Sequence, residues 1–185
     1  MADAVVLPGG RYPPTAPLTW YAGDVAERRG ATVHRHVWSG KPPVPPNPPS
    51  KGWLPASVEG WVDGEVTPLL DGIGGRPLLI GKSLGTVSAV VAADRSLPAV
   101  WLTPLLSLPW AAATLRRATA PYVLVGGTAD PYWDGALARQ LSPHVLEVQD
   151  ADHTMVVPGP LTESIAVLGR VVDAIEEFLE TIAWP

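Results

Sequence analysis

A short segment in the first half of the chain restricts most strongly how the chain can fold. An apolar run over residues 77–80 stops at the sequence Gly-Lys-Ser-Leu-Gly (residues 81–85), and small residues follow over 86–93. The run predicts a buried strand, and the small residues predict a helix that begins at about residue 84. Because a strand that turns directly into a helix leaves little space, side chains at the two glycine positions would collide with neighbouring elements. The sequence therefore predicts a tight strand–turn–helix unit with Ser83 at its apex.

The same alternation of strand and helix continues along the chain. Short apolar runs predict strands at residues 4–7, 31–38, 77–80, 99–102, 122–125 and 145–148. The spacing of apolar residues predicts helices at 18–29, 58–70, 84–93, 111–117, 133–141 and 161–183. The last helix is expected to bury one apolar face, formed by Ile165, Leu168, Val172, Ile175 and Leu179.

This order of elements predicts one type of architecture. Near-continuous apolar strands separated by helices indicate a parallel sheet that is covered on both faces. We therefore predict a single α/β domain over residues 1–185, doubly wound, with a mostly parallel sheet of about six strands.

The composition excludes several classes of protein and site. Cysteine is absent, which excludes disulfides, thiolate catalysis and cysteine-based zinc sites. The net charge of −5 comes without a basic stripe, which argues against nucleic acid as a partner. We expect no membrane partner, because no apolar window of about 18 residues is present. The N-terminus lacks the basic region of a signal peptide, and we expect a cytoplasmic monomer or homodimer.

Three side chains suited to nucleophilic or acid–base chemistry follow predicted strands. Ser83 follows the strand at 77–80, Asp130 follows the strand at 122–125, and His153 follows the strand at 145–148. Functional groups of a parallel sheet gather at the carboxyl ends of its strands, so we expect these side chains to meet. A strand, the pattern G-x-S-x-G and a helix form the layout of a nucleophile elbow, and the chain order Ser…Asp…His is that of a hydrolase triad.

On these residues the chain resembles the alpha/beta-hydrolase superfamily, and in particular its small, lidless serine hydrolases. The resemblance rests on residues 81–85, on Gly-Gly-Thr-Ala-Asp at 126–130 and on Ala-Asp-His at 151–153, and it extends in order over almost the whole chain. It implies a minimal form of the fold, without the two strands that precede the first strand in full-size relatives and without a cap domain. It also implies that the strands at 4–7 and 77–80 lie side by side in the middle of the sheet.

The resemblance implies a role for each member of the triad. Ser83 would attack a carbonyl carbon, and His153 would accept and return the proton. Asp130 would hold the imidazole in the required tautomer and stabilise the imidazolium. Alternative acids are Asp134, Asp150 and Asp152, although the side chain of Asp152 should diverge from the adjacent ring. The rival histidines are His34, His36 and His144, none of which falls where the family places its base.

Two backbone donors are needed for the tetrahedral oxyanion that such a reaction forms. One is the N–H of Leu84, directly after the nucleophile. The second should come from the loop after the first strand, where we favour Gly10 by analogy with relatives whose oxyanion residue follows a His-Gly pair. Because Pro8 stands where that histidine would be, Arg11 is the alternative donor.

Lys82 allows two interpretations and one alternative motif. It could project over the site and attract acidic substrates, but we favour a solvated lysine whose stem covers apolar surface. Gly-Lys-Ser also ends the phosphate-binding motif G-x-x-x-x-G-K-[ST], yet position 76 is Arg76 and a strand would occupy the phosphate loop. These two differences argue against a phosphate-binding loop. His34 and His36 point the same way from a strand without a third ligand, so we expect no metal, and we expect no cofactor.

The predicted activity is hydrolysis of a small carboxylic ester or thioester through an acyl-enzyme on Ser83, with a small molecule as the partner. Trp110 and Trp133 are the predicted substrate-binding residues, beside a stiff proline-rich surface loop at 40–50 and Trp53. Without a cap, the site should be shallow and open. The alternative is a scaffold or binding module with little or no turnover, whose partner surface is formed by the proline-rich loop and exposed tryptophans.

Overall fold

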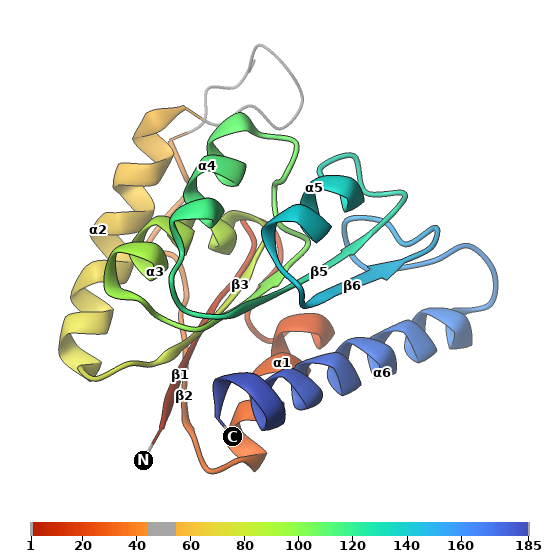
Figure 1. Ribbon diagram of the computed structural model, residues 1–185, viewed down its shortest axis with the longest axis horizontal. Helices are drawn as coiled ribbons and strands as arrows, with labels where there is room; N and C mark the ends of the chain where they lie inside the picture. The colour runs from red at the N-terminus through yellow and green to blue at the C-terminus, as the bar shows by residue number, and fades with distance from the viewer. Residues whose placement is uncertain (1, 44–54, 185) are drawn as a thin grey trace.

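A parallel sheet lies between two layers of helices. A computed structural model of the protein describes residues 2–43 and 55–184 (Figure 1). In this part of the chain, six parallel strands form one sheet in the order β2-β1-β3-β4-β5-β6. The strands are β1 (Asp3–Leu7), β2 (Thr32–Arg35), β3 (Leu78–Lys82), β4 (Ala99–Leu102), β5 (Tyr122–Gly127) and β6 (Val145–Val148). The prediction of a doubly wound, mostly parallel sheet is confirmed.

The burial of each strand follows from its position in the sheet. β1, β3, β4 and β5 are interior strands and almost all of their residues are buried, as their continuous apolar sequences predict. β2 and β6 form the two edges and are only half-buried. β1 pairs with β3, with Leu7 opposite Gly81, so the expected adjacency of these two strands is confirmed.

The helices cover both faces of the sheet. α1 (Pro17–Arg28) and α6 (Leu161–Phe178) pack on one face, over the strand residues whose side chains point that way (Figure 1). The other face is covered by α2 (Ala56–Ile73), α3 (Ala89–Arg95), α4 (Pro109–Arg117) and α5 (Gly135–Leu141). Because strand side chains alternate between faces, each interior strand contributes to both apolar cores.

The turn after β3 differs from the prediction. The chain forms a 3₁₀ helix over Ser83–Ser88, and α3 begins only at Ala89, whereas the sequence predicted one helix from about residue 84. The Thr86 hydroxyl donates to the carbonyl oxygen of Ser83 at 2.6 Å, and the Ser88 hydroxyl donates to Gly85. Side-chain hydroxyls thus donate hydrogen bonds to main-chain carbonyl oxygens of this turn. Helix propensity alone does not reveal such bonds.

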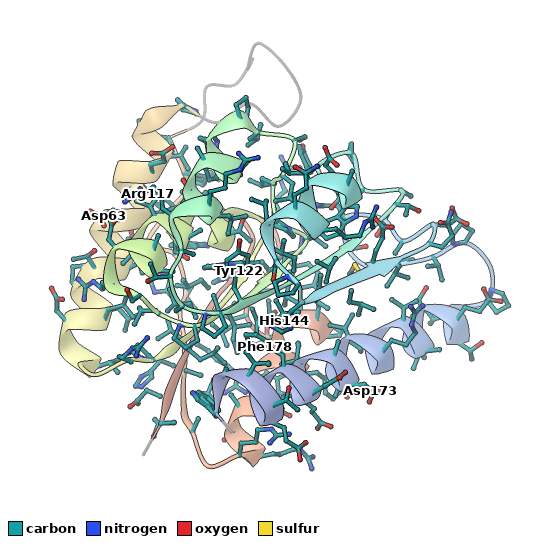
Figure 2. The ribbon with its side chains drawn as sticks, in the orientation of Figure 1. Asp63, Arg117, Tyr122, His144, Asp173 and Phe178 are labelled. Carbon is teal, nitrogen blue, oxygen red and sulfur yellow. The ribbon has the colours of Figure 1, made fainter. Side chains whose placement is uncertain are left out.

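The predicted apolar face of the last helix is partly wrong. Ile165 is 59% exposed, whereas the buried residues of α6 are Ser164, Val167, Val171, Ile175 and Phe178. The Ser164 hydroxyl accepts a hydrogen bond from the N–H of Val157 at 3.1 Å, so a polar residue occupies the packed face. At its other end the helix places Phe178 against His144, with ring centroids 5.5 Å apart (Figure 2). Apolar periodicity missed this rotation because it gives no weight to a buried serine.

Most of the proline-rich loop at 40–50, together with Trp53, lies outside the described residues. In the part of the chain that the structure describes, every helix is too short or too polar to cross a bilayer.

Candidate active site

Ser83 occupies a strained position at the carboxyl end of β3. Its φ of 51° lies in the left-handed region, which serine adopts only when the surroundings enforce it. A Cβ atom at Gly81 would lie 2.6 Å from the Trp101 ring, and one at Gly85 would overlap the carbonyl oxygen of Leu7 on β1. The two glycines therefore let the turn pack directly against β1 and β4, as the sequence predicted.

Gly85→Ala is expected to destabilise the fold by about 3 kcal/mol or more, because the added methyl group meets rigid strand backbone. Gly169→Ala provides a matched control, since a Cβ atom at this position in α6 meets open space. There we expect a stability gain of about 0.5–1 kcal/mol. Urea unfolding followed by circular dichroism measures both changes, and equal midpoints for the two variants would contradict the packing described for the turn.

The structure brings Ser83, His153 and Asp130 into one hydrogen-bonded line. His153 Nε2 lies 2.8 Å from the Ser83 hydroxyl oxygen, and His153 Nδ1 lies 2.7 Å from Asp130 Oδ2. The Asp130 side chain is fully buried, and its other oxygen accepts the N–H of Tyr132 at 2.9 Å. In this line the hydroxyl can donate to Nε2 while Nδ1–H donates to the carboxylate. This is the arrangement in which a serine hydroxyl becomes a nucleophile.

Gly127 at the end of β5 and the loop after β6 set the distance between Asp130 and His153. A Cβ atom at Gly127 would overlap the carbonyl oxygen of Ala151, and the Ala129 N–H donates to that same oxygen at 3.1 Å. The turn that carries the acid is thus fixed against the loop that carries the imidazole. The ring of Tyr132 meets the imidazole edge-on, with centroids 5.0 Å apart.

The rival acids are engaged elsewhere. Asp152 accepts hydrogen bonds from Thr154 and from the N–H of Val156, so its carboxylate turns away from the imidazole. Burial acts to raise the pKa of Asp152, but these hydrogen bonds outweigh it and lower the pKa. Asp134 caps α5 by accepting the N–H of Leu137, and Asp150 accepts the Gln149 amide.

The rival histidines also have other partners. His34 on β2 lies 2.9 Å from Asp3, and His36 lies 2.9 Å from Glu65 of α2. Burial acts to raise the pKa of Glu65, but hydrogen bonds from Ser39 and His36 outweigh it and lower the pKa. Among the described residues, no group of three or more His, Asp or Glu side chains could hold a metal ion.

The loop after β1 lies beside the turn at Ser83. Gly9 and Tyr12 close a tight turn, and a Cβ atom at Gly10 would lie 3.5 Å from the Leu84 side chain. Within the described part of the chain, the N–H groups of Gly10 and Leu84 donate to no protein acceptor. Neither amide is therefore committed to an acceptor within the described part of the chain. The Trp38 indole donates to the Pro8 carbonyl at 3.1 Å and fixes this loop, a role that the sequence analysis did not identify.

The environment of Lys82 contradicts the prediction of a solvated side chain. Lys82 is only 2% exposed, and its ammonium donates to the carbonyl oxygen of His153 at 3.0 Å. The ammonium also lies 4.9 Å from the centroid of the Tyr12 ring. Burial lowers the pKa of Lys82 to about 8, although the Asp130 and Asp152 carboxylates oppose this shift. The prediction failed because an exposed stem and a buried stem look the same in sequence.

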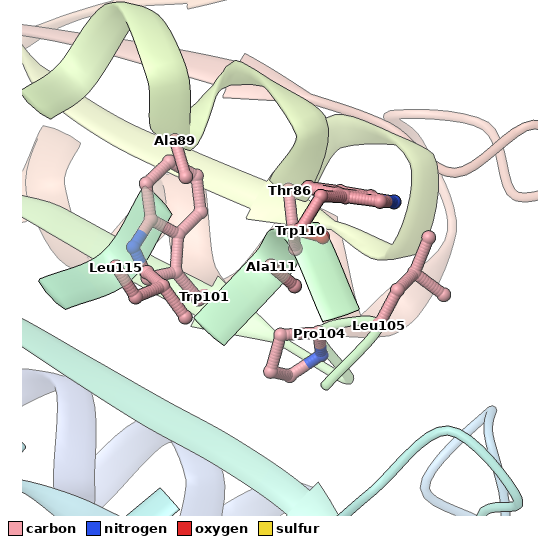
Figure 3. Close-up of a pocket in the computed structure, with 8 residues that line it drawn as sticks. All are labelled: Thr86, Ala89, Trp101, Pro104, Leu105, Trp110, Ala111 and Leu115. Atoms are coloured by element: carbon pink, nitrogen blue, oxygen red, sulfur yellow. The ribbon is translucent and has the colours of Figure 1, made fainter. Parts of the chain in front are cut away.

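A small apolar pocket adjoins the turn that carries Ser83. It holds about 210 Å³, part of it open to solvent, and is lined by Thr86, Ala89, Trp101, Pro104, Leu105, Trp110, Ala111 and Leu115 (Figure 3). Trp110, one of the two predicted substrate-binding tryptophans, is in its wall. Trp133 is not: its ring packs over Gly126 and its indole N–H donates to Glu147 at 2.7 Å. Sequence alone did not distinguish these two environments.

Comparisons with known proteins agree on the fold. No family model matches the sequence, and no curated protein matches it. Among solved structures, a protein of the alpha/beta superfamily of hydrolases from Xanthomonas campestris is 19% identical, with a TM-score of 0.68 over 98% of this chain and 100% of that one. Est1E from Butyrivibrio proteoclasticus is 11% identical, with a TM-score of 0.72 over 97% and 87%, and another of its structures contains ferulic acid. An alpha/beta serine hydrolase without a lid from Xanthomonas campestris is 16% identical, with a TM-score of 0.57 over 96% and 82%.

Proposed function

We propose that this chain, which has the alpha/beta-hydrolase fold, is a serine hydrolase that acts on small carboxylic esters or thioesters. The observation that carries the proposal is the line of hydrogen bonds from Ser83 through His153 to Asp130, at 2.8 and 2.7 Å. These residues come from the ends of β3, β6 and β5, so the sheet itself holds them in register. The structural neighbours that are described as hydrolases support the same class of function.

In the first half of the reaction, the Ser83 oxygen attacks the carbonyl carbon while His153 Nε2 takes the hydroxyl proton. The negative charge that forms on the carbonyl oxygen is bound by the N–H groups of Leu84 and Gly10. When the tetrahedral intermediate collapses, the bond to the leaving group breaks and the imidazolium gives its proton to the departing alcohol or thiol. The product of this half is an acyl-enzyme on Ser83.

In the second half, His153 takes a proton from water and the resulting hydroxide attacks the acyl carbon. Collapse of the second tetrahedral intermediate breaks the bond to Ser83, which recovers the proton from His153, and a carboxylic acid leaves. Asp130 stabilises the imidazolium in both halves. The part of the mechanism that the protein supplies is therefore proton transfer together with a fixed anion site.

The apolar pocket supports a small, uncharged acyl or alcohol group as the part of the substrate that is recognised. The pocket is small, and Thr86 is the one polar residue among the eight that line it. Est1E has been solved with ferulic acid bound, and this carboxylic acid supports acyl derivatives of carboxylic acids as the substrate class.

A panel of chromogenic acetyl, butyryl and octanoyl esters, with matching thioesters and amides, tests the proposal on the wild type and on Ser83→Ala. We expect turnover of esters or thioesters by the wild type and only background hydrolysis by the variant. Equal rates for both proteins would refute the proposal. Absence of all turnover would instead favour the alternative, a binding module on this fold.

We also expect acyl chain length to report on the pocket. The wild type should prefer short chains and lose at least about tenfold in kcat/KM at octanoyl, because the extra methylenes find no apolar space. Trp110→Ala should move the optimum to longer chains by removing part of the wall. Trp133→Phe is the matched control, since this ring packs outside the pocket and its profile should not change. A wild-type preference for long chains would contradict this assignment.

A further inference from the structure

A buried ammonium group connects three segments of the candidate active site. Lys82 directly precedes Ser83 at the end of β3, and its stem lies against Gly9 in the loop after β1. Its ammonium reaches the loop after β6, where it donates to the His153 carbonyl oxygen at 3.0 Å. An elbow serine needs a neighbour at this position, but it does not need a buried charge. The side chain therefore calls for a separate explanation.

Two neighbouring residues at the carboxyl end of β3 hold His153, one at its side chain and the other at its main chain. Ser83 contacts the imidazole Nε2, whereas Lys82 contacts the main-chain carbonyl. The rest of this loop is held mainly by turns of its own, such as the bond from the Met155 N–H to Asp152, and by the contact of Ala151 with the acid's turn. The hydrogen bond from the Lys82 ammonium thus ties the main chain of His153 to β3, the strand that leads to the nucleophile.

A buried lysine is costly for the fold unless its charge is compensated. Each element packed around the ammonium contributes to this compensation. The ring face of Tyr12 comes from the loop after β1, the Asp130 carboxylate from the turn after β5, and the Asp152 carboxylate from the loop after β6. The imidazole of His153, which belongs to the same residue as the bonded carbonyl, is a further titratable group nearby. The surroundings therefore favour a protonated lysine at neutral pH.

We propose that Lys82 is a positioning residue of this hydrolase, whose ammonium holds the main chain of His153 so that the imidazole keeps its hydrogen bond to Ser83. The inference rests on the function proposed above. An ammonium forms a charge-assisted hydrogen bond with the carbonyl, which is roughly twice as strong as the bond that a neutral amine can form. Loss of the proton from Lys82 should therefore loosen the loop and lower activity.

The pKa of Lys82, which burial lowers to about 8, sets where this loss occurs. Tyr12 does not titrate in the same range, because burial raises its pKa above the ordinary value. The unfolded chain keeps the lysine proton up to its ordinary pKa of 10.5, so the folded chain binds fewer protons between about pH 8 and 10.5. Stability should consequently rise with pH in this window while activity falls. A lysine that only stabilised the fold would not make activity fall with pH while stability rises.

The test compares the wild type with Lys82→Met, Lys82→Arg and the control Lys41→Met, which makes the same change at an exposed lysine. For the wild type and the control, we expect kcat/KM to fall above a midpoint near pH 8. For Lys82→Met we expect a loss of about 10- to 100-fold at pH 7 and no fall at this midpoint. Lys82→Arg keeps its charge, so any activity it retains should persist to pH 10. A Lys82→Met profile that still falls near pH 8 would overturn the inference.

A second readout does not depend on turnover. Hydrogen–deuterium exchange over residues 151–157, referenced to intrinsic rates, should be faster in Lys82→Met than in the wild type and in Lys41→Met. The sequence contains three lysines, so the Nζ resonance of Lys82 can be identified by its loss in the variant and titrated directly. Exchange rates over residues 151–157 that are the same in Lys82→Met and in the wild type would overturn the positioning role of Lys82, even if the chain proved to have no hydrolase activity. Turnover that is lost in Ser83→Ala but unaffected in Lys82→Met would remove only this inference.

Discussion

Replacing His153 by alanine is expected to lower kcat/KM for the best ester by about 10⁶-fold, while the fold is retained. The imidazole is part-buried between Ser83 and Asp130, and its Nε2 is the atom placed to accept the proton of the serine hydroxyl. Without it, the hydroxyl attacks as a neutral alcohol and the leaving group departs without a proton. Initial rates with a butyryl ester measure the change.

His34→Ala serves as the matched control for this experiment. His34 lies on the edge strand β2, where it pairs with Asp3, and we expect its loss to leave activity within a factor of two of the wild type. If His153→Ala retained activity comparable to the control, another base would have to act on the serine, and the hydrogen-bonded line would not describe the working enzyme.

Asp130→Asn is expected to lower turnover by about 10⁴-fold without unfolding the protein. The carboxylate accepts the proton of His153 Nδ1, whereas the amide nitrogen of an asparagine would donate to it. The imidazole would then carry its hydrogen on Nε2, where it cannot accept a proton from Ser83. The substitution should thus lower activity by changing the tautomer of His153, while the volume of the side chain at position 130 stays the same.

Asp134→Asn makes the same chemical change in the next turn of the chain. Asp134 caps α5 through the N–H of Leu137, and asparagine caps helices about as well as aspartate. We therefore expect full activity and an unchanged melting temperature for this control. Full activity of Asp130→Asn, or a large loss in Asp134→Asn, would assign the role of the acid to a different residue.

Much of the fold followed from short-range steric and solvation requirements that are visible in the sequence. The interior strands are buried on both faces, so they had to be continuous apolar runs, and β1, β3, β4 and β5 were each recognisable for this reason. Likewise, Gly81 and Gly85 are needed where strand and helix approach closely. Ser83, Asp130 and His153 each follow a strand, and this placement predicted that they meet at the carboxyl end of the sheet.

The parts that the sequence did not reveal depend on tertiary surroundings. Whether the stem of Lys82 lies in solvent or under the loop after β1 depends on Gly9 and Tyr12, which are 73 and 70 residues away in the sequence. The same holds for Trp133, whose ring fills the space left by Gly126 instead of lining a pocket. Long side chains allow several placements, and only the packed neighbours select one.

The central claim is that Ser83 is activated by the line of hydrogen bonds through His153, and a fluorophosphonate reagent tests it most directly. The activated oxygen would attack phosphorus and expel fluoride, leaving a stable phosphonyl ester whose mass can be measured on the intact protein. We predict one adduct per chain in the wild type, mapped by peptide sequencing to Ser83, and none in Ser83→Ala. An unmodified wild type, or the same adduct on the alanine variant, would contradict the account.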